Sequence, residues 1–341
     1  MKKLKLAFVG LGWIGRHRMQ ALVEQGLMDD AVFADVNGLC IDEALKIFPG
    51  ASVAERLEQV DFEGVDGVVL ATPSALHAQQ TISTLNAGCP VFCQKPLARS
   101  AEECRLVVDA AKVNDKLLGV DFSYRYLEAI SRMKDLLDNG AIGKVYSVDT
   151  VFHNAYGPDK AWFYDPRLAG GGCVMDLGVH LVDLVLWLLG FPDVRDVHSR
   201  LFRGGVPFSG EGVEDFASVH LDLGNDAQMR MACSWNLPAG QDAQIECTLY
   251  GTAGALSLKN VNGSFYDFRL ERFWGTSREV LADPPDSWGG RAAVAWAAKV
   301  SRGETGFDSS AEQFCNVCEV LDKIYSASAC FSTSEERSGI L

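Results

Sequence analysis

A glycine-rich turn between an apolar run and a helical pattern constrains the fold of this chain more than any other feature. Residues 4–9 form a short, mostly apolar run, the next six residues read GLGWIG, and a helical pattern follows over residues 14–25. In this setting of strand, tight turn and helix, the glycines let a pyrophosphate rest on backbone amides at a helix N-terminus. The spacing therefore predicts a dinucleotide site formed by Gly10, Gly12, Trp13, Ile14 and Gly15.

An acidic side chain follows the second expected strand, which covers residues 31–34. Asp35 lies twenty residues after Gly15, at the position where a carboxylate would hydrogen-bond the ribose hydroxyls of an adenosine. The alternative is a strand-end acid that caps the next helix. Val36 and Asn37 follow, and no adjacent Arg or Lys is present to hold a 2′-phosphate, so the sequence favours NAD over NADP.

Strand and helix patterns continue to alternate as far as residue 121. The expected strands cover residues 65–71, 91–93 and 117–121, and the expected helices cover residues 75–86 and 101–114. This alternation predicts a parallel, doubly wound sheet. Ligands of such sheets bind beyond the carboxyl ends of the strands, where the sequence places Thr72, Pro73, His77, Gln94 and Lys95.

Two of these side chains have more than one interpretation. His77 suits a packing or capping role better than a catalytic one, and a lysine that follows a strand is usually only solvated. Lys95 differs because it lies between a strand and Pro96, whose ring fixes the local backbone and whose peptide bond is compatible with the cis isomer. We therefore expect Lys95 to have a fixed position at this edge.

A nearly all-apolar helix is expected over residues 173–189. Thirteen of its seventeen residues are apolar and three glycines precede it; such a helix is buried and is too short to span a bilayer. Its ionisable residues are Asp176, His180 and Asp183, which the helical repeat places along one stripe. A structural ladder inside the core is one interpretation. A catalytic carboxylate–imidazole pair in a pocket is favoured, because the glycines allow a ligand or backbone to approach the helix N-terminus.

Residues 123–341 show a different pattern from the predicted Rossmann domain at residues 1–122. The expected strands cover residues 144–154, 194–203, 216–223, 228–235, 243–250, 255–258 and 264–272, and the other expected helices cover residues 126–137, 292–301 and 311–328. This order predicts an α+β domain with an open, mainly antiparallel sheet and helices on one face. We expect a partner subunit to pack against the face of the sheet that carries no helices, which suggests a homodimer or homotetramer.

The charge balance narrows the range of partners. The chain of 341 residues has a formal net charge of −14, which argues against nucleic acid or an anionic membrane surface, since both select basic patches. Its ten cysteines show no metal-ligand spacing beyond one CxxC at Cys315 and Cys318. We therefore expect reduced thiols, no metal site and a cytoplasmic location.

Separated motifs of this chain coincide with those of one family. They are GLGWIG, CQKP, GGGCVMDLGVH and TPSALH, and they resemble the glucose–fructose oxidoreductases and inositol dehydrogenases over most of the chain. The resemblance implies a Rossmann domain, a C-terminal domain with an open sheet, and oxidation or reduction of a sugar or cyclitol hydroxyl by a nicotinamide. It also implies that Lys95 is the catalytic lysine, that Asp176 grips the substrate and that His180 is the acid/base.

One position departs from the family pattern. Gln94 replaces the glutamate of the usual Glu-Lys-Pro, which removes a carboxylate beside Lys95 and would make its ammonium easier to deprotonate. It also puts in doubt any cofactor contact that the glutamate would make. The effect of this replacement has to be found in the residues around it.

The expected reaction assigns one role to each catalytic residue. His180 would take the hydroxyl proton while a hydride leaves for NAD, Asp176 would hydrogen-bond the sugar or the imidazole, and Lys95 would stabilise charge on the oxygen. Aromatic side chains suit the apolar faces of a sugar, and Arg, His and Asn suit hydroxyls or a phosphate. The expected substrate contacts are Arg125, His153, Asn154 and Trp162, besides Asp176 and His180; the first four have a structural interpretation as well.

The leading interpretation is thus an NAD-dependent sugar or cyclitol dehydrogenase. The resemblance leaves two alternatives, which are glycoside hydrolysis through transient oxidation by bound NAD and non-catalytic sensing of a dinucleotide and a sugar. The joint presence of Lys95, Asp176 and His180 argues against a sensor, because a sensor has no need of an acid/base group.

Overall fold

The computed structural model describes residues 2–224 and 226–338, with side chains up to residue 328, and the chain divides into two compact units. The first unit comprises Met1–Ser123 and Gly289–Cys315, and the second comprises Tyr124–Trp288 and Asn316–Leu341. The change of unit after Ser123 lies next to the boundary that the sequence indicates. Residues 289–315 return to the first unit, although the sequence pattern assigns them to the second domain.

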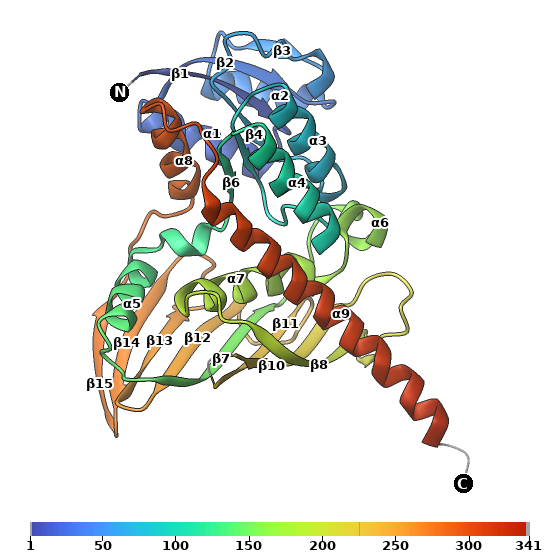
Figure 1. Ribbon diagram of the computed structural model, residues 1–341, viewed down its shortest axis with the longest axis vertical. Helices are drawn as coiled ribbons and strands as arrows, with labels where there is room; N and C mark the ends of the chain where they lie inside the picture. The colour runs from blue at the N-terminus through green and yellow to red at the C-terminus, as the bar shows by residue number, and fades with distance from the viewer. Residues whose placement is uncertain (1, 225, 339–341) are drawn as a thin grey trace. The chain divides into compact units, whose positions relative to one another are not determined.

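The first unit contains a six-stranded sheet in the order β3-β2-β1-β4-β5-β6 (Figure 1). Every pair of neighbours in it is parallel. This is the strand order of a doubly wound dinucleotide-binding fold, so the predicted Rossmann-type sheet is confirmed. The strands are β1 Leu4–Val9, β2 Met28–Ala34, β3 Ser52–Ala54, β4 Gly67–Leu70, β5 Val91–Cys93 and β6 Leu118–Val120.

Helices form the connections of this sheet, and one helix returns to it from late in the chain. The amide of Glu103 donates to the hydroxyl of Ser100 at 3.2 Å and caps one helix start as the sequence indicates. In the returning helix, Trp296 packs where an added Cβ on Gly67 or Gly119 would lie 2.6 and 2.9 Å from its ring. The helices are α1 Trp13–Glu24, α2 Gly38–Ile47, α3 Ser74–Asn86, α4 Ala101–Val113 and α8 Arg291–Ser301.

The second unit is built on a nine-stranded sheet in the order β15-β14-β13-β12-β7-β11-β10-β8-β9. Among the described strands, β7 and β11 pair in parallel and the other neighbours are antiparallel. The predicted open, mainly antiparallel sheet is confirmed. The strands are β7 Val145–Asn154, β8 Val194–Arg203, β9 Val206–Pro207, β10 Phe216–Leu223, β11 Ala227–Ser234, β12 Ala243–Gly251, β13 Gly254–Asn260, β14 Phe268–Trp274 and β15 Ser277–Ala282.

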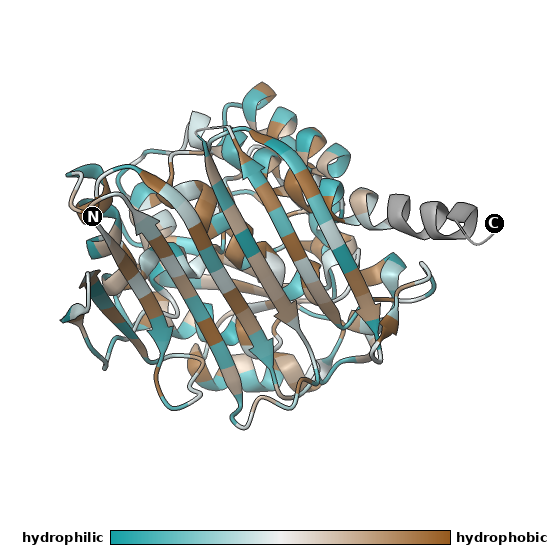
Figure 2. Cartoon of the chain, turned by 90° about the horizontal axis from the view of Figure 1, so that it is seen from below, coloured by the Kyte–Doolittle hydropathy of each residue, from teal (hydrophilic) through white to brown (hydrophobic). Residues whose placement is uncertain are grey.

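The two faces of this sheet have different surroundings. Helices α5 Glu128–Asp138, α7 Val179–Leu188 and α9 Gln313–Ser338 lie on one face, here called the covered face (Figure 1). Figure 2 shows the strands of the opposite, open face without a helix over them in the described part of the chain. Because side chains alternate along a strand, Phe152 and His153 of β7 point to opposite faces.

The apolar helix expected over residues 173–189 has two parts. A π-helical turn, Val174–Gly178, opens it, and α7 continues from Val179 to Leu188. By length and composition, Pro166–Leu188 could cross a membrane, but 83% of its most apolar window is buried inside the protein. This burial is the environment of a core helix, and the π-helical turn is a local irregularity that is common at functional sites.

Candidate active site

The glycine-rich turn after β1 has the geometry that a bound pyrophosphate needs. Gly10 has a φ of +86°, and an added Cβ there would lie 2.5 Å from the backbone of Ala71. An added Cβ on Gly15 would lie 2.2 Å from the carbonyl oxygen of Gly10. Gly12 precedes α1, and no side chain caps this end of the helix. The first amides of α1 can therefore bind a phosphate, so the turn fits NAD.

The side chain of Asp35 binds backbone amides in and near the glycine-rich turn. Its carboxylate accepts hydrogen bonds from the amides of Leu11 at 2.6 Å and Asn37 at 2.8 Å. The side chain of Asn37, and not that of Asp35, accepts the amide of Leu39 and caps α2, so the alternative of a helix-capping acid is wrong. The bond to Leu11 fixes Asp35 beside the dinucleotide turn. Contact with an adenosine ribose stays a prediction.

His77 connects the loops that follow β4 and β5. Its Nδ1 lies 2.7 Å from the carbonyl oxygen of Pro96, and its Nε2 lies 2.7 Å from that of Thr72. The ring is buried, which lowers its pKa. Both ring nitrogens thus face the protein backbone, and His77 positions the two loops instead of offering a nitrogen to a cofactor. The hydroxyl of Thr72 is also engaged, since it donates to Gln80 at 2.6 Å.

Gln94 and Lys95 occupy the loop after β5, and the Lys95–Pro96 peptide is cis. The side-chain amide of Gln94 donates to Asp121 at 2.5 Å. Asp121 also pairs with Arg18 at 2.5 Å. The residue that replaces the expected glutamate therefore has a carboxylate partner of its own, contributed by the loop after β6.

Two of the three glycines before the π-helical turn make room for protein atoms. An added Cβ on Gly172 would lie 1.8 Å from the carbonyl oxygen of Glu214, and one on Gly171 would lie 2.0 Å from the hydroxyl of Tyr325. The carboxylate of Glu214 accepts the amide of Val174 at 2.9 Å and the hydroxyl of Tyr325 at 2.9 Å. Of the two approaches that the glycines allow, by a ligand or by backbone, the structure shows the backbone of Glu214, whose buried carboxylate occupies the helix N-terminus, where its charge is favourable. Burial raises the pKa of Glu214, and these hydrogen bonds oppose the rise.

Asp176 and His180 lie on the covered face, around the side chain of Tyr124. The indole Nε1 of Trp235 donates to the carboxylate of Asp176 at 3.1 Å. The ring of His180 meets the ring of Tyr124 edge to face at 5.0 Å. Burial raises the pKa of Tyr124, and the charges of Tyr266 and Asp176 raise it further. The structure therefore brings the predicted carboxylate and imidazole to one aromatic-lined region.

Asn154 and Trp162 lie on the same side of the second unit as this pair. Asn154 ends β7 on the face to which Phe152 points, and Phe152 packs 6.2 Å from His180. The Oδ1 atom of Asn154 is buried, and no hydrogen-bond partner for it lies among the described residues. Trp162 stacks on Phe163 at 3.8 Å. A substrate hydroxyl is the kind of donor that the Asn154 oxygen lacks.

Arg125 is engaged inside the second unit. Its guanidinium makes two bonds to Asp183, at 2.9 and 2.5 Å, and it packs over the rings of Trp187 and Phe191. Burial raises the pKa of Asp183, and the charge of Arg125 opposes the rise. The structure thus shows a buried ion pair that fixes α7 at its third predicted ionisable position, and contact of Arg125 with a substrate stays a prediction.

His153 lies on the open face, away from His180. Its Nδ1 lies 2.7 Å from the hydroxyl of Ser234, and its ring stacks on Phe216. Burial lowers the pKa of His153. The structure does not bring His153 together with the other expected substrate contacts, because neighbouring residues of a strand point to opposite faces.

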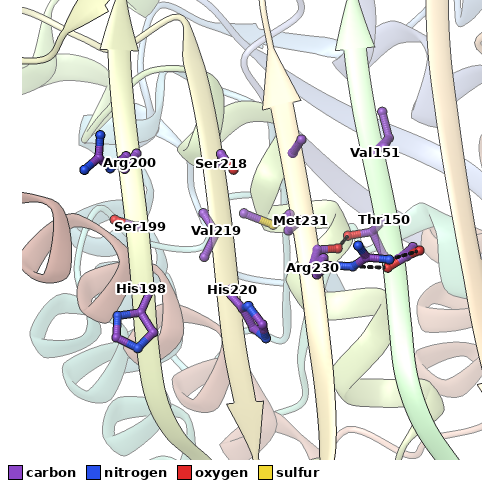
Figure 3. A pocket seen from close by; sticks show the side chains of 12 residues that line it. Thr150, Val151, His198, Ser199, Arg200, Ser218, Val219, His220, Arg230 and Met231 are labelled. Atoms are coloured by element: carbon purple, nitrogen blue, oxygen red, sulfur yellow. Dashed lines mark hydrogen bonds and ion pairs between the residues drawn. The ribbon is translucent and has the colours of Figure 1, made fainter.

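The open face carries a hollow of about 550 Å³ between β7, β8, β10 and β11. Figure 3 shows His198, His220 and Arg230 on neighbouring strands in this hollow. Arg230 is paired with Asp149 at 2.6 Å, and His198 lies 3.1 Å from Asp196. The guanidinium of Arg230 in this hollow is thus neutralised by a neighbouring carboxylate.

Sequence reasoning misses the aromatic residues that surround the pair. Tyr124 packs against the rings of Phe268 and Trp288, and Trp288 packs against Tyr266. Trp235 could have been predicted as a site residue, because it is the last residue of the expected strand at residues 228–235. That strand pairs in parallel with β7, whose last residue is Asn154. In the described part of the chain, no group of three or more His, Cys, Asp or Glu is arranged to hold a metal.

Two family models match this chain. The model of an oxidoreductase family with an NAD-binding Rossmann fold matches residues 4–122, and the model of a GFO/IDH/MocA C-terminal domain matches residues 130–257. The first model covers the parallel sheet with the glycine-rich turn. The second begins in α5 and includes Asp176, His180 and Trp235.

Individual proteins are similar over different shares of the chain. D-glucoside 3-dehydrogenase of Escherichia coli is 32% identical over 139 residues, which is 40% of each chain. Levoglucosan dehydrogenase of Pseudarthrobacter phenanthrenivorans is 28% identical over 75% of this chain and 73% of its own. The crystal structure of GenD2 from gentamicin A biosynthesis, in complex with NAD, is 26% identical and matches with a TM-score of 0.80, over 96% of this chain and 95% of that chain.

Proposed function

Because this chain belongs to the GFO/IDH/MocA family of oxidoreductases with an NAD-binding Rossmann fold, we propose that it oxidises a secondary hydroxyl of a sugar, a sugar derivative or a cyclitol. The observation that carries the proposal is the grouping of Asp176 and His180 around Tyr124. A carboxylate and an imidazole form the acid/base arrangement that oxidation of an alcohol needs. Relatives named for glucosides and levoglucosan support a substrate of this class.

Three side chains divide the chemical work in this proposal. His180 removes the hydroxyl proton, and it returns the proton when the reaction runs in reverse. Asp176, held by the indole of Trp235, hydrogen-bonds a substrate hydroxyl and fixes the orientation of the sugar. Lys95 provides positive charge where the oxygen of the substrate becomes negative.

NAD fits the first unit and supplies, when bound, the nicotinamide that accepts a hydride from carbon. The turn of Gly10, Gly12 and Gly15 holds its pyrophosphate, and Asp35 binds the adenosine ribose. A carboxylate at Asp35 would repel a 2′-phosphate, and Val36 and Asn37 offer no positive charge to hold one. We therefore propose NAD as the preferred cofactor over NADP.

The substrate pocket in this proposal combines flat apolar surfaces with two hydrogen-bond acceptors, the carboxylate of Asp176 and the Oδ1 of Asn154. Aromatic rings bind the C–H faces of sugars, and Trp235 contacts Tyr164 at 5.6 Å and Phe163 at 6.4 Å. The buried Oδ1 of Asn154 accepts a substrate hydroxyl. These groups favour a compact polyhydroxy ring over an extended apolar alcohol.

The direct test is NADH formation on a panel of inositols, aldoses, glycosides and sugar phosphates. Absorbance of NADH with one class of substrate supports the dehydrogenase. Cleavage of p-nitrophenyl glycosides without net NADH, with NAD retained through purification, would indicate the hydrolase alternative. NAD and sugar binding without either reaction would indicate a sensor.

Removing the indole N–H of Trp235 tests the role of Asp176. In Trp235→Phe, we expect kcat/KM to fall about 10- to 100-fold, because a hydrogen bond to a charged group contributes about 1.5–3 kcal/mol. Steady-state kinetics should show most of the loss in KM, since Asp176 orients the substrate. Trp296→Phe is the matched control, because the buried Nε1 of Trp296 has no hydrogen-bond partner in the described structure. Equal kinetics for both variants would contradict the role.

We also propose that a second copy of the chain covers the open face, giving a homodimer or homotetramer. Ser218 is exposed on β10, on this face of the sheet, and an arginine there would obstruct a close contact. Light scattering should give a multiple of the chain mass for the wild type and a smaller multiple for Ser218→Arg. Ser83→Arg on the exposed side of α3 should leave the mass unchanged. An unchanged mass for Ser218→Arg would exclude this face.

A cytoplasmic location is proposed from the state of the thiols. The nine cysteines whose side chains the structure describes are all free. Burial raises the pKa of Cys93 and of Cys247 to about 12. Such thiols are unreactive and persist in a reducing compartment.

A further inference from the structure

A buried polar cluster lies at the carboxyl edge of the parallel sheet, next to Lys95. Gln94 follows β5, Asp121 follows β6 and Arg18 lies in α1, one turn after the glycine-rich motif. Their exposed fractions are 7%, 1% and 6%, respectively. Ions at such depth are tolerated only when donors and acceptors match. The cluster therefore has to be explained by its hydrogen bonds.

Three donors converge on the carboxylate of Asp121 in this cluster. Its Oδ2 accepts from the Nε of Arg18 and the Nε2 of Gln94, each at 2.5 Å, and its Oδ1 accepts from the hydroxyl of Ser123 at 2.5 Å. An ionised carboxylate only accepts hydrogen bonds. The side chain at position 94 must therefore present a donor, which an amide does and an ionised glutamate does not.

We propose that Asp121 is a positioning residue that, through its hydrogen bond with Gln94, holds the segment of Gln94, Lys95 and Pro96, here called the Lys95 segment. The carboxylate that is missing at position 94 is in this way supplied by Asp121. Gln94 directly precedes Lys95. Its backbone amide donates to the carbonyl oxygen of Leu70 in the sheet, and its side-chain amide donates to Asp121. The inference rests on the proposed function in one respect, namely that the Lys95 segment forms part of the NAD site. It assigns to Gln94 and Asp121 one joint role.

If the proposal is correct, the NAD affinity of the Gln94→Glu variant should fall as the pH rises. Two carboxylates within hydrogen-bond distance do not both ionise readily, so they share a proton at low pH. A protonated carboxyl group at position 94 could donate to Asp121 as the amide does. When rising pH removes that proton, the two charges repel and the Lys95 segment moves. The variant should therefore keep NAD binding on the acid side and lose it on the alkaline side.

Other titratable and charged groups lie around residues 94 and 121. Arg18 pairs with Asp121, and the Nδ1 of His17 lies 2.8 Å from Arg18. Burial and the charge of Arg18 lower the pKa of His17, whereas Asp121 raises it. Cys93 lies close by with a raised pKa. Wild type and variants share these groups, so their effect cancels in a comparison.

NAD affinity measured by titration calorimetry from about pH 5.5 to about pH 8.5 tests the proposal. We expect Gln94→Glu to bind NAD as tightly as the wild type at the acid end. At the alkaline end its affinity should be lower by at least about tenfold, the factor that a displacement of one pKa unit represents. The exchanged pair Gln94→Glu with Asp121→Asn restores one donor and one carboxylate, and should recover wild-type affinity at every pH.

The matched control is Gln20→Glu, because the amide of Gln20 also donates to a carboxylate, Glu24, at 2.8 Å, but on an exposed surface of α1. It should bind NAD like the wild type throughout. An affinity of Gln94→Glu that follows the wild type across the range would overturn the proposal. If Gln94→Glu does not fold, the exchanged pair decides: recovery of folding and affinity supports the joint role, and failure overturns it. A wild type that binds NAD but reduces none with any sugar would refute the proposed function and leave this comparison intact.

Discussion

Replacing His180 with alanine should lower kcat by about 10²- to 10⁴-fold, the range over which a positioned general acid/base accelerates a reaction. The imidazole packs against Tyr124 and Phe152 on the covered face, and its loss leaves the substrate hydroxyl without a base. Stopped-flow or steady-state formation of NADH at saturating substrate measures the effect. Affinity for NAD should not change, because His180 lies in the second unit and the NAD-binding motifs lie in the first.

Added imidazole provides the control for this variant. A free base that enters the vacated position should restore part of the rate in His180→Ala and have no effect on the wild type. The unfolding temperature should also be measured, since a loss of rate together with a loss of folding would have another cause. A kcat within a factor of about three of the wild type, far outside the expected range, would remove His180 from the role.

Replacing Arg125 with methionine should reduce the free energy of unfolding by about 3–5 kcal/mol, which is the usual effect of removing one partner of a buried ion pair. Asp183 is 1% exposed, so its carboxylate would remain in the core without the guanidinium. Chemical denaturation at pH 7 measures the loss. The loss should shrink as the pH falls, because removal of Arg125 raises the pKa of Asp183 further and the neutral acid is tolerated in the core.

Two further variants show whether burial is the cause. Arg269→Met breaks a two-bond pair with Asp283, at 2.8 and 3.0 Å, whose side chains are 43% and 46% exposed, and should reduce stability far less than Arg125→Met does. The double variant Arg125→Met with Asp183→Leu removes both buried charges and should recover most of the loss. A small effect of Arg125→Met, equal to that of Arg269→Met, would show that the pair contributes little.

The sequence predicts the parallel sheet well because its signals are local. The run at residues 4–9, the glycine turn and the following helix are contiguous in the sequence. Gly10 and Gly15 of this turn approach only atoms of Gly10, Ala71 and Thr72, which belong to the same unit. β3 escapes prediction because it has three residues and none of them is buried. The return of α8 to the first unit also escapes, because the space for Trp296 is made by Gly67 and Gly119, far away in the sequence.

The candidate site is predicted only in part, for a physical reason of the same kind. The helical repeat identifies Asp176, His180 and Asp183, but it does not show that Asp183 pairs with Arg125, 58 residues away. The three glycines indicate a close approach, but the approaching group, Glu214, lies on a distant segment. A histidine at position 153 is chemically suited to bind a sugar hydroxyl. Which face of β7 points to the site depends on the position of α7, which the local sequence does not show.

The central claim is that a hydride passes from a carbon of a sugar or cyclitol to NAD, and isotope transfer tests it most directly. A substrate from the active class, deuterated at the carbon that bears the oxidised hydroxyl, is incubated with NAD and the enzyme, and the cofactor is analysed by mass spectrometry and NMR. We expect deuterium at C4 of the nicotinamide in accumulated NADH, and far slower transfer with His180→Ala. Product that retains all the deuterium, with NAD unlabelled and unreduced, would contradict it.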